Sequence, residues 1–181
     1  VEIVSKNPWV SRGALKLLSA LEEFKISPNN WICADAGSCT GGFTDVLLNK
    51  DAKRVYAIDS SYGDLAWKLR QNESVVVMER TNVNEIESLP DLLDLFTLDV
   101  SLISLRTIIP NISHLLKKDG HIIALIKPQY EAQKDQVPKG GVITEKETHF
   151  NILHDLLNWM QTLEFKPTGL INSPITGGSG N

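Results

Sequence analysis

The chain has 181 residues, of which 42% are hydrophobic and 22% are charged. This composition is ordinary for a globular protein, and the length is sufficient for one domain with a sizeable core. The formal net charge of −4 argues against a module that binds nucleic acid through its overall field, since phosphate binding draws on clustered Lys and Arg side chains. No stretch approaches the roughly 18 to 20 consecutive apolar residues of a membrane-spanning helix, so no membrane segment is predicted.

The cysteines and histidines give no sign of a metal or redox site. Cys33 and Cys39 have a spacing that fits neither a C-x-x-C redox motif nor a zinc knuckle. The four histidines of the sequence form no H-x-x-x-H pair with an acidic partner. We therefore expect reduced thiols, a cytoplasmic protein and no bound metal.

Helical and strand-like patterns alternate along the chain. Ser11 is a candidate N-cap for a helix that continues to Phe24, with leucines at helical spacing. Short apolar runs predict strands at residues 31–34, 54–58, 75–78, 92–98 and 121–126, and helical spacing predicts helices at residues 43–49, 65–69, 105–116 and 145–163. A sixth strand is predicted at residues 166–172, and the long loop 127–144 is expected to contribute to a site. The alternation predicts an α/β fold with a mostly parallel, doubly wound sheet.

A glycine-rich run, Asp35-Ala-Gly-Ser-Cys-Thr-Gly-Gly-Phe-Thr44, joins the first predicted strand to the following helix. A strand that ends in Asp, glycines that permit close backbone approach and the N–H groups of a helix N-terminus can together hold a nucleotide or a carboxylate. The spacing departs from the dinucleotide pattern G-x-G-x-x-G and is more like the loop of S-adenosylmethionine-dependent methyltransferases. The alternative is a structural strand-to-helix turn without a ligand. The predicted cofactor contacts are Asp35, Gly37, Ser38, Thr40, Gly41, Gly42, Phe43 and Thr44.

Polar residues also end the later strands. Asp59 follows the second strand at the distance from the glycine run that is usual for ribose-binding acids. Asn82 follows the third strand, where it could hydrogen-bond an adenine or merely cap a turn. Asp99 ends the fourth strand and Lys127 the fifth. Because the carboxyl ends of parallel strands share one edge of a sheet, these residues are expected to lie near the glycine run.

The order of several motifs resembles the TlyA-type hemolysin or rRNA 2′-O-methyltransferase family, within the broader FtsJ-like methyltransferases. The resemblance spans nearly the whole chain and is carried by Val10-Ser-Arg-Gly13 with Lys16, Asp35 to Thr44, Tyr62-Gly63 with Leu65-Ala-Trp-Lys-Leu-Arg70, Glu79-Arg-Thr-Asn82, Leu98-Asp-Val-Ser101, Lys127-Pro-Gln-Tyr-Glu131, Lys139-Gly-Gly-Val142 and Ser173-Pro-Ile-Thr-Gly177. It implies a Rossmann-like, class I S-adenosylmethionine (SAM)-dependent methyltransferase fold of about seven strands, with SAM as cofactor. Residues 1–181 are then expected to be the FtsJ-like domain without the family's N-terminal RNA-binding domain and with the last strand truncated.

The resemblance further implies that the chain methylates a ribose 2′-hydroxyl, with cytidine the nucleoside and ribosomal RNA or ribosomal subunits the partners. FtsJ-like enzymes use a Lys-Asp-Lys-Glu tetrad, to which Lys16, Asp99 and Lys127 are similar in position, while the Glu would lie beyond the last residue of this sequence. In this interpretation Lys127 accepts the hydroxyl proton, Lys16 is a second cation, and Asp99 orients both and lies near the sulfonium. An ordinary ion pair between Lys127 and Asp99, with Lys16 a solvated helix charge, is the alternative.

Two other function classes remain open from the sequence. The first is a membrane-lytic protein, as the name hemolysin suggests, although no membrane-active segment is recognisable. The second is a catalytically silent SAM- and RNA-binding module that acts in ribosome assembly by docking alone.

Overall fold

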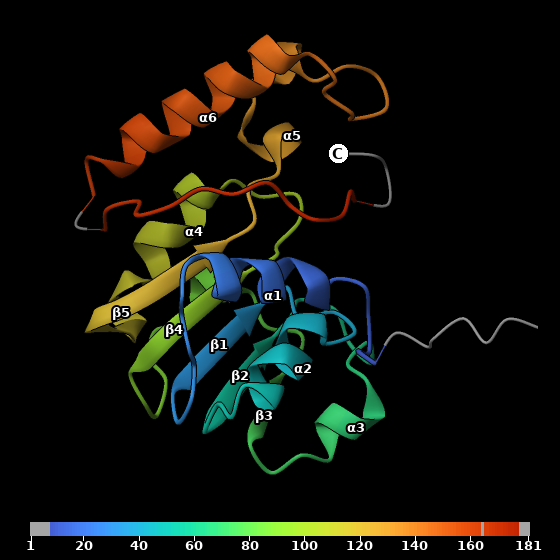
Figure 1. The fold of residues 1–181 in the computed structure, drawn as a ribbon, viewed down its shortest axis with the longest axis vertical. Helices are drawn as coiled ribbons and strands as arrows, with labels where there is room; N and C mark the ends of the chain where they lie inside the picture. Colours follow the sequence, from blue (N-terminus) through green and yellow to red (C-terminus); the bar gives the residue numbers. More distant parts are fainter. Residues whose placement is uncertain (1–7, 164, 178–181) are drawn as a thin grey trace, which may run out of the picture.

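Five parallel strands form the centre of the computed structural model, which describes residues 8–163 and 165–177. The strands are β1 (Ile32–Ala36), β2 (Arg54–Ile58), β3 (Val75–Met78), β4 (Leu93–Leu98) and β5 (Leu116–Ala124), and they pair in the order β3-β2-β1-β4-β5 (Figure 1). Each pair of neighbours runs parallel. The chain moves outward from β1 to β3 and then crosses back to β4, so the order reverses between β1 and β4. Ligands of open α/β sheets bind at the carboxyl ends of the strands at such a reversal.

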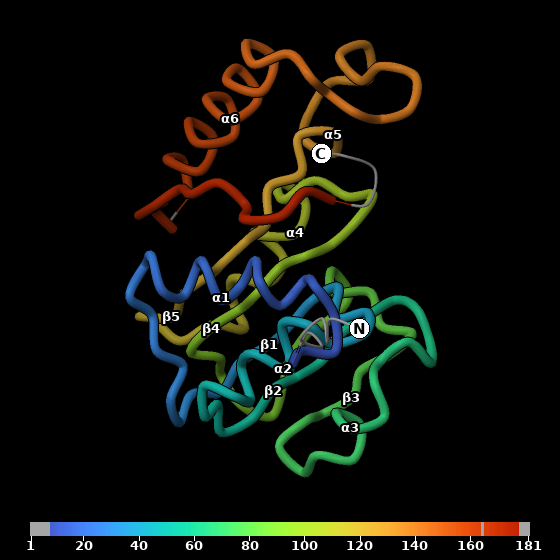
Figure 2. The backbone as a smooth tube through the Cα atoms, turned by 45° about the vertical axis from the view of Figure 1, so that its right-hand side comes forward, coloured from blue at the N-terminus to red at the C-terminus, as the bar shows by residue number. Residues whose placement is uncertain are grey.

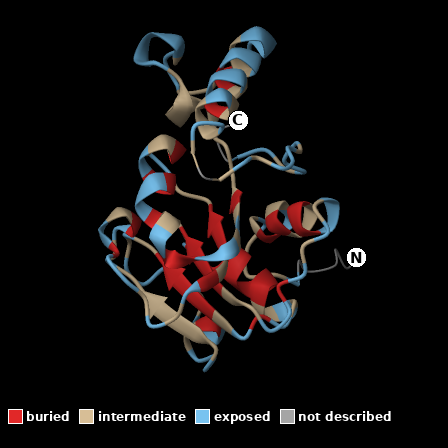
Figure 3. Ribbon diagram, turned by 90° about the vertical axis from the view of Figure 1, so that its left-hand side faces the viewer, coloured by how far each residue is buried: buried red, intermediate tan, exposed pale blue. Residues whose placement is uncertain are grey.

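Helices cover both faces of the sheet. On one face, α1 (Ala14–Glu23) and α2 (Gly42–Asn49) pack against Cys33, Val55 and Leu95, and the short α3 (Trp67–Arg70) packs beside them. On the other face, α4 (Leu105–Ile112) packs against Ala34 and Phe96. Successive side chains of a strand point to opposite faces, which is why neighbouring residues such as 33 and 34 belong to different clusters. The central strands are therefore buried on both sides (Figure 3), and the predicted doubly wound α/β fold is confirmed.

A smaller layer of structure lies beside the sheet. It contains α5 (Pro128–Glu131) and α6 (Lys146–Met160), and the short helices η1 (Val83–Glu85), η2 (Ser113–Leu115) and η3 (Lys134–Gln136) occur elsewhere in connecting segments. Residues 165–177 run as an extended segment between α6 and α1, as both ribbon and tube views show (Figures 1 and 2). No helix among the described residues is both long and apolar enough to cross a membrane.

Several predicted boundaries are wrong. Residues 166–172 form no strand: Gly169 lies against the Phe24 ring and Ile171 packs with the α1 cluster, so this segment is held by side chains rather than by a ladder. Strand β5 begins at Leu116, because a shift in its pairing with β4 accommodates the polar residues after it. Helix α1 begins at Ala14, and its N-cap is Gly13 rather than Ser11.

Candidate active site

The glycine-rich loop is anchored by a buried carboxyl group at the end of β1. Asp35 is 1% exposed, and its Oδ2 accepts hydrogen bonds from the backbone N–H of Thr44 at 2.9 Å and from the Thr44 hydroxyl at 2.7 Å. Its Oδ1 accepts a bond from the Thr97 hydroxyl at 3.2 Å. Burial raises the pKa of Asp35 to about 7, although these hydrogen bonds oppose the increase. Asp35 thus holds the first turn of α2 against the sheet. Its partner Thr44 is fully buried and supplies both donors of this contact.

Two glycines of the loop allow close contact with other parts of the protein. A Cβ at Gly37, where φ is +80°, would lie 2.6 Å from the carbonyl oxygen of Asp99. A Cβ at Gly42 would lie 2.3 Å from the Ser11 hydroxyl and 3.0 Å from the backbone nitrogen of Ala14. No side chain fits at those distances. The loop therefore lies directly against both the end of β4 and the start of α1.

The second acid, Asp59, is tied to the glycine loop. Its Oδ2 accepts the N–H of Cys39 at 2.8 Å, and its Oδ1 accepts the N–H of Ser61 at 2.8 Å. Partial burial acts to raise the pKa of Asp59, but these backbone donors outweigh it and the pKa is lowered. Asp59 is therefore a fixed carboxylate next to the loop. Asn82 is not tied to the glycine loop by a hydrogen bond of this kind. Its side chain accepts the N–H of Asn84 at 3.1 Å and so caps η1, which is the capping role considered beside an adenine contact.

The three predicted catalytic residues meet in one cluster. The carboxylate of Asp99, just beyond β4, binds the Lys16 amine through Oδ2 at 3.0 Å and the Lys127 amine through Oδ1 at 2.8 Å. The side chains of Lys16, Asp99 and Lys127 are only 16 to 18% exposed. Lys16 comes from α1 and is not a solvated helix charge. One carboxylate thus holds two lysines from different elements, with one more positive charge than negative.

Further oxygens fix the direction of the Lys127 side chain. Its amine donates to the carbonyl oxygen of Val100 at 2.8 Å and to the Ser101 hydroxyl at 3.1 Å. Together with Asp99, these atoms can accept all three hydrogens of the ammonium group. The amine is therefore held at the loop that follows β4.

A second carboxylate holds the segments that carry these residues. Glu131, at the end of α5, accepts the hydroxyl of Ser104 at 2.6 Å and the N–H of Leu105 at 2.8 Å. Leu105 begins α4, so Glu131 supplies an acceptor to one of the helix N–H groups that have no acceptor within the helix. The contact joins the chain four residues after Lys127 to the chain shortly after Asp99. Sequence reasoning did not single out Glu131, although it belongs to the Lys127-Pro-Gln-Tyr-Glu131 motif.

A cavity of about 180 Å³ opens beside the glycine loop and reaches Asp99. Part of its wall is the N-terminus of α2, where helix geometry leaves backbone N–H groups without intrahelical acceptors. Ser11, Gly13 and Cys39 also line the cavity, although none of them was predicted; Ser11 and Gly13 belong to the Val10–Gly13 motif, which was the available signal. The predicted residues that line it are Asp35, Gly37, Ser38, Thr40, Gly42, Phe43 and Asp99, whereas Gly41, Thr44, Asp59 and Asn82 do not.

A second cavity, of about 300 Å³, lies where α5 faces residues 173–177. Lys16 and Lys127 line it, whereas Asp99, their shared partner, lines the cavity at the glycine loop. The cluster thus borders both spaces. Groups of three or more His, Cys, Asp or Glu side chains that could hold a metal ion are absent from residues 8–163 and 165–177.

The model of the FtsJ-like methyltransferase family matches residues 9–181. The chain belongs to this family. A relative from Bacillus subtilis (strain 168), provisionally named rRNA methyltransferase YqxC, is 45% identical over 183 residues, which cover 98% of this chain and 65% of that protein. A Mycobacterium tuberculosis (strain ATCC 25618 / H37Rv) protein named 16S/23S rRNA (cytidine-2′-O)-methyltransferase TlyA is 42% identical over 179 residues, covering 98% of this chain and 67% of that protein.

A solved structure gives the same result for the fold. It belongs to a hemolysin-named protein from Streptococcus thermophilus and matches with a TM-score of 0.94 at 40% identity, covering 98% of this chain and 66% of that one. The FtsJ-like chain thus spans about two thirds of the length of these relatives. The resemblance drawn from the ordered motifs and the Rossmann-like fold that it implied are both confirmed, but the sheet has five strands in the described residues where the resemblance implied about seven.

Proposed function

We propose that this FtsJ-like chain is the methyltransferase domain of an enzyme that transfers a methyl group from SAM to a ribose 2′-hydroxyl of ribosomal RNA. The observation that carries the proposal is the Lys16–Asp99–Lys127 cluster, in which one carboxylate binds two lysine amines next to the glycine-loop cavity. Such a cluster offers both a proton acceptor and a negative charge, which are the two groups that methylation of a hydroxyl requires.

The residues around the smaller cavity fit SAM. The N-terminus of α2 favours a carboxylate, because its N–H groups and the helix dipole attract negative charge. Asp59 does not line this cavity but accepts the N–H of Cys39, which does, and it stands at the end of β2, where an acid binds ribose hydroxyls in related folds. Asp99 is an anion suited to a sulfonium. When bound, SAM supplies an electrophilic methyl group on a positively charged sulfur atom.

The chain's own residues supply the proton chemistry. In the proposal, Lys127 reacts as a neutral amine, whose lone pair takes the proton of the 2′-hydroxyl so that the group becomes an ammonium. The oxygens of Asp99, Val100 and Ser101 accept its N–H groups and keep that amine in one place. Lys16 balances the charge of the cluster, because a Lys127 without its extra proton leaves a neutral Lys16–Asp99 pair. Alignment of the hydroxyl with the methyl group provides the rest of the rate enhancement.

The proposal also names the RNA, the nucleoside and the cellular compartment. Ribosomal RNA and cytidine are proposed because the Mycobacterium tuberculosis relative carries both in its name. A ribosomal substrate also suits a cytoplasmic protein. Contacts with RNA beyond the acceptor nucleotide would come from other parts of the full-length protein, which agrees with the net charge of −4 for these 181 residues.

The test uses full-length protein, ribosomal subunits and isotopically labelled SAM, followed by mapping of the labelled ribose. Lys127→Ala should reduce the rate by roughly 10²- to 10⁴-fold, the range for loss of a general base. Lys117→Ala is the matched control, because Lys117 also forms an ion pair with an aspartate, Asp94 at 2.7 Å, outside the proposed site. Methylation that continues unchanged in the Lys127→Ala protein would rule out Lys127 as the base.

A further inference from the structure

Two segments of the chain leave the sheet next to each other at the proposed site. The last backbone hydrogen bond between them joins the N–H of Leu125 to the carbonyl oxygen of Leu98 at 2.8 Å. Beyond it, one segment continues through Asp99 to the start of α4, and the other continues through Lys127 into α5 (Figure 1). Because the pairing of β4 with β5 ends at this point, side chains must hold the two segments at a fixed separation beyond the sheet.

Side chains link the two segments at two points. The first link is the Lys127 amine, which is bound to oxygens of residues 99–101. The second link is Glu131, whose carboxylate accepts the Ser104 hydroxyl at 2.6 Å and the N–H of Leu105 at 2.8 Å. The segment between Asp99 and α4 is thus held to the α5 segment at both of its ends.

The α5 segment transmits position from one link to the other. The N–H of Tyr130 donates to the carbonyl oxygen of Lys127 at 2.9 Å, and the N–H of Ala132 donates to that of Pro128 at 2.9 Å. These bonds form a single helical turn between Lys127 and Glu131. A displacement of Glu131 would therefore also displace the backbone of Lys127.

The other segment contains a strained residue between the two links. Leu102 has a φ of +66°, in the left-handed region that non-glycine residues seldom adopt. Its side chain is 86% exposed, so its own packing does little to hold this conformation. A strained conformation persists where the surrounding contacts determine it. The links through Lys127 and Glu131, one on each side of Leu102, are placed to do so.

We propose that Glu131 is a positioning residue of the methyltransferase, which keeps residues 99–104 in the arrangement that holds the Lys127 amine in place. This inference rests on the proposed function and adds a residue to it. Glu131 lines neither the glycine-loop cavity nor the larger one. Its effect on the rate therefore passes through Lys127 and the acceptors of its amine, without contact with SAM or RNA.

The test measures kcat and the dissociation constant of SAM in full-length protein, at a temperature where circular dichroism shows every variant to be folded. Glu131→Ala should lower kcat on the order of 10- to 100-fold, because a small displacement of a catalytic group has an effect of that size. Glu131→Gln keeps an oxygen for the N–H of Leu105 and an amino group for the Ser104 hydroxyl, so kcat should stay within about threefold of wild type. The affinity for SAM should be unchanged in both variants, since neither Glu131 nor its partners line the glycine-loop cavity.

Asp91→Ala is the matched control for a loss of stability. The Asp91 carboxylate also accepts two hydrogen bonds, from the Arg54 guanidinium at 2.6 Å and from the Tyr56 hydroxyl at 2.8 Å. Asp91 precedes β4 and Arg54 begins β2, so this contact lies at the amino ends of the strands, away from the cluster. Asp91→Ala should leave kcat unchanged. An equal loss of kcat in Asp91→Ala and Glu131→Ala would assign both effects to destabilisation and overturn the inference.

The decisive measurement combines Glu131→Ala with changes at the Lys127 amine, in single-turnover reactions with labelled SAM. In a Lys127→Ala background, Glu131→Ala should cause no further decrease, because the group through which it acts is already absent. In a Ser101→Ala background, which removes one acceptor of the amine, the combined loss should be smaller than the product of the two single losses.

Two results would overturn the inference while leaving the proposed function intact. One is a Glu131→Ala protein with wild-type kcat, and the other is a loss by the same factor in the wild-type, Lys127→Ala and Ser101→Ala backgrounds. Failure of the proposed function is distinguishable, because methylation would then continue unchanged in Lys127→Ala itself, and that result would refute both.

Discussion

Replacing Asp35 with asparagine should remove most of the pH dependence of stability between pH 5 and pH 7. Asparagine fits the site, because its amide oxygen can accept both Thr44 bonds and its amino group can donate to the Thr97 hydroxyl. The Thr97 hydroxyl can accept that bond since its own hydrogen is shared with the carbonyl oxygen of Ala34. The substitution therefore removes the titration of the group without removing its contacts.

The expected magnitude follows from the pKa of Asp35, which burial raises from 3.8 to about 7 in the folded chain. As the pH rises through this range, the unfolded chain loses the proton first, so the folded state binds more protons and the free energy of unfolding falls. At about 1.4 kcal/mol per pKa unit, ionised Asp35 costs the folded state about 4 kcal/mol once the pH exceeds 7. Roughly 2 kcal/mol of this change occurs between pH 5 and pH 7.

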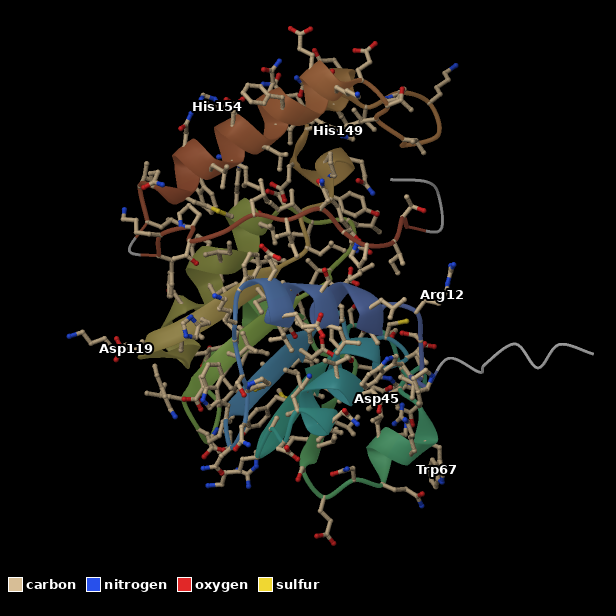
Figure 4. All side chains as sticks on the ribbon, in the orientation of Figure 1. Arg12, Asp45, Trp67, Asp119, His149 and His154 are labelled. Atoms are coloured by element: carbon tan, nitrogen blue, oxygen red, sulfur yellow. The ribbon has the colours of Figure 1, made fainter. Side chains whose placement is uncertain are left out.

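The assay is urea unfolding at pH 5, 6, 7 and 8, followed by circular dichroism. With a urea slope of about 2 kcal/mol per molar, the wild-type midpoint should fall by about 1 M between pH 5 and pH 7 relative to Asp35→Asn. Asp119→Asn is the matched control, because Asp119 is exposed and projects from the edge of the molecule (Figure 4). If wild type and Asp35→Asn lose stability in parallel over this range, the assignment of a raised pKa to Asp35 is wrong.

Two further predictions concern reactivity and stability. Cys39 is exposed at the glycine-loop cavity, whereas Cys33 is fully buried and its pKa is raised by burial to about 12, so a maleimide should label Cys39 alone in the native protein and label Cys33 only after unfolding. S-adenosylhomocysteine should slow the labelling of Cys39, and labelling at the same rate with and without it would contradict the placement of the cofactor. Glu131→Ala should lower the free energy of unfolding by about 1 to 2 kcal/mol, because Ser104 and Leu105 lose their acceptor, and Glu131→Gln should recover much of that loss in urea titrations. Equal stabilities of the two variants would count against a capping role.

The strands of the sheet were predictable because strands of a parallel sheet, buried on both faces, read as short apolar runs. Residues 54–58 and 75–78 were predicted with the bounds that the structure has. The beginning of β5 was not, since Lys117 to Gly120 are polar and resemble a turn, and only the pairing with β4 makes them part of a strand. Within residues 166–172 only Leu170 and Ile171 form an apolar pair, while Pro167 and Gly169 disfavour a strand, and no neighbouring edge pairs with this segment.

The site was predictable to the extent that residues at strand ends converge. The meeting of Asp99 and Lys127 follows from the parallel order of β4 and β5. The raised pKa of Asp35 and the lowered pKa of Asp59 do not follow from the sequence. Burial raises the first and backbone donors lower the second, and tertiary packing sets both. Glu131 was missed for the same reason, as its partners are 26 and 27 residues away.

The proposed catalytic cluster also has a consequence for the folding of the domain during synthesis. The ion pair between Lys16 and Asp99 joins residues 83 positions apart, and Lys127 lies 28 positions beyond Asp99. Contacts of such high sequence separation carry a loop-closure cost that must be met before they form. A nascent chain on the ribosome therefore has no complete cluster until β5 and Lys127, three residues beyond it, have emerged, so the proposed methyl transfer would report complete folding of the domain.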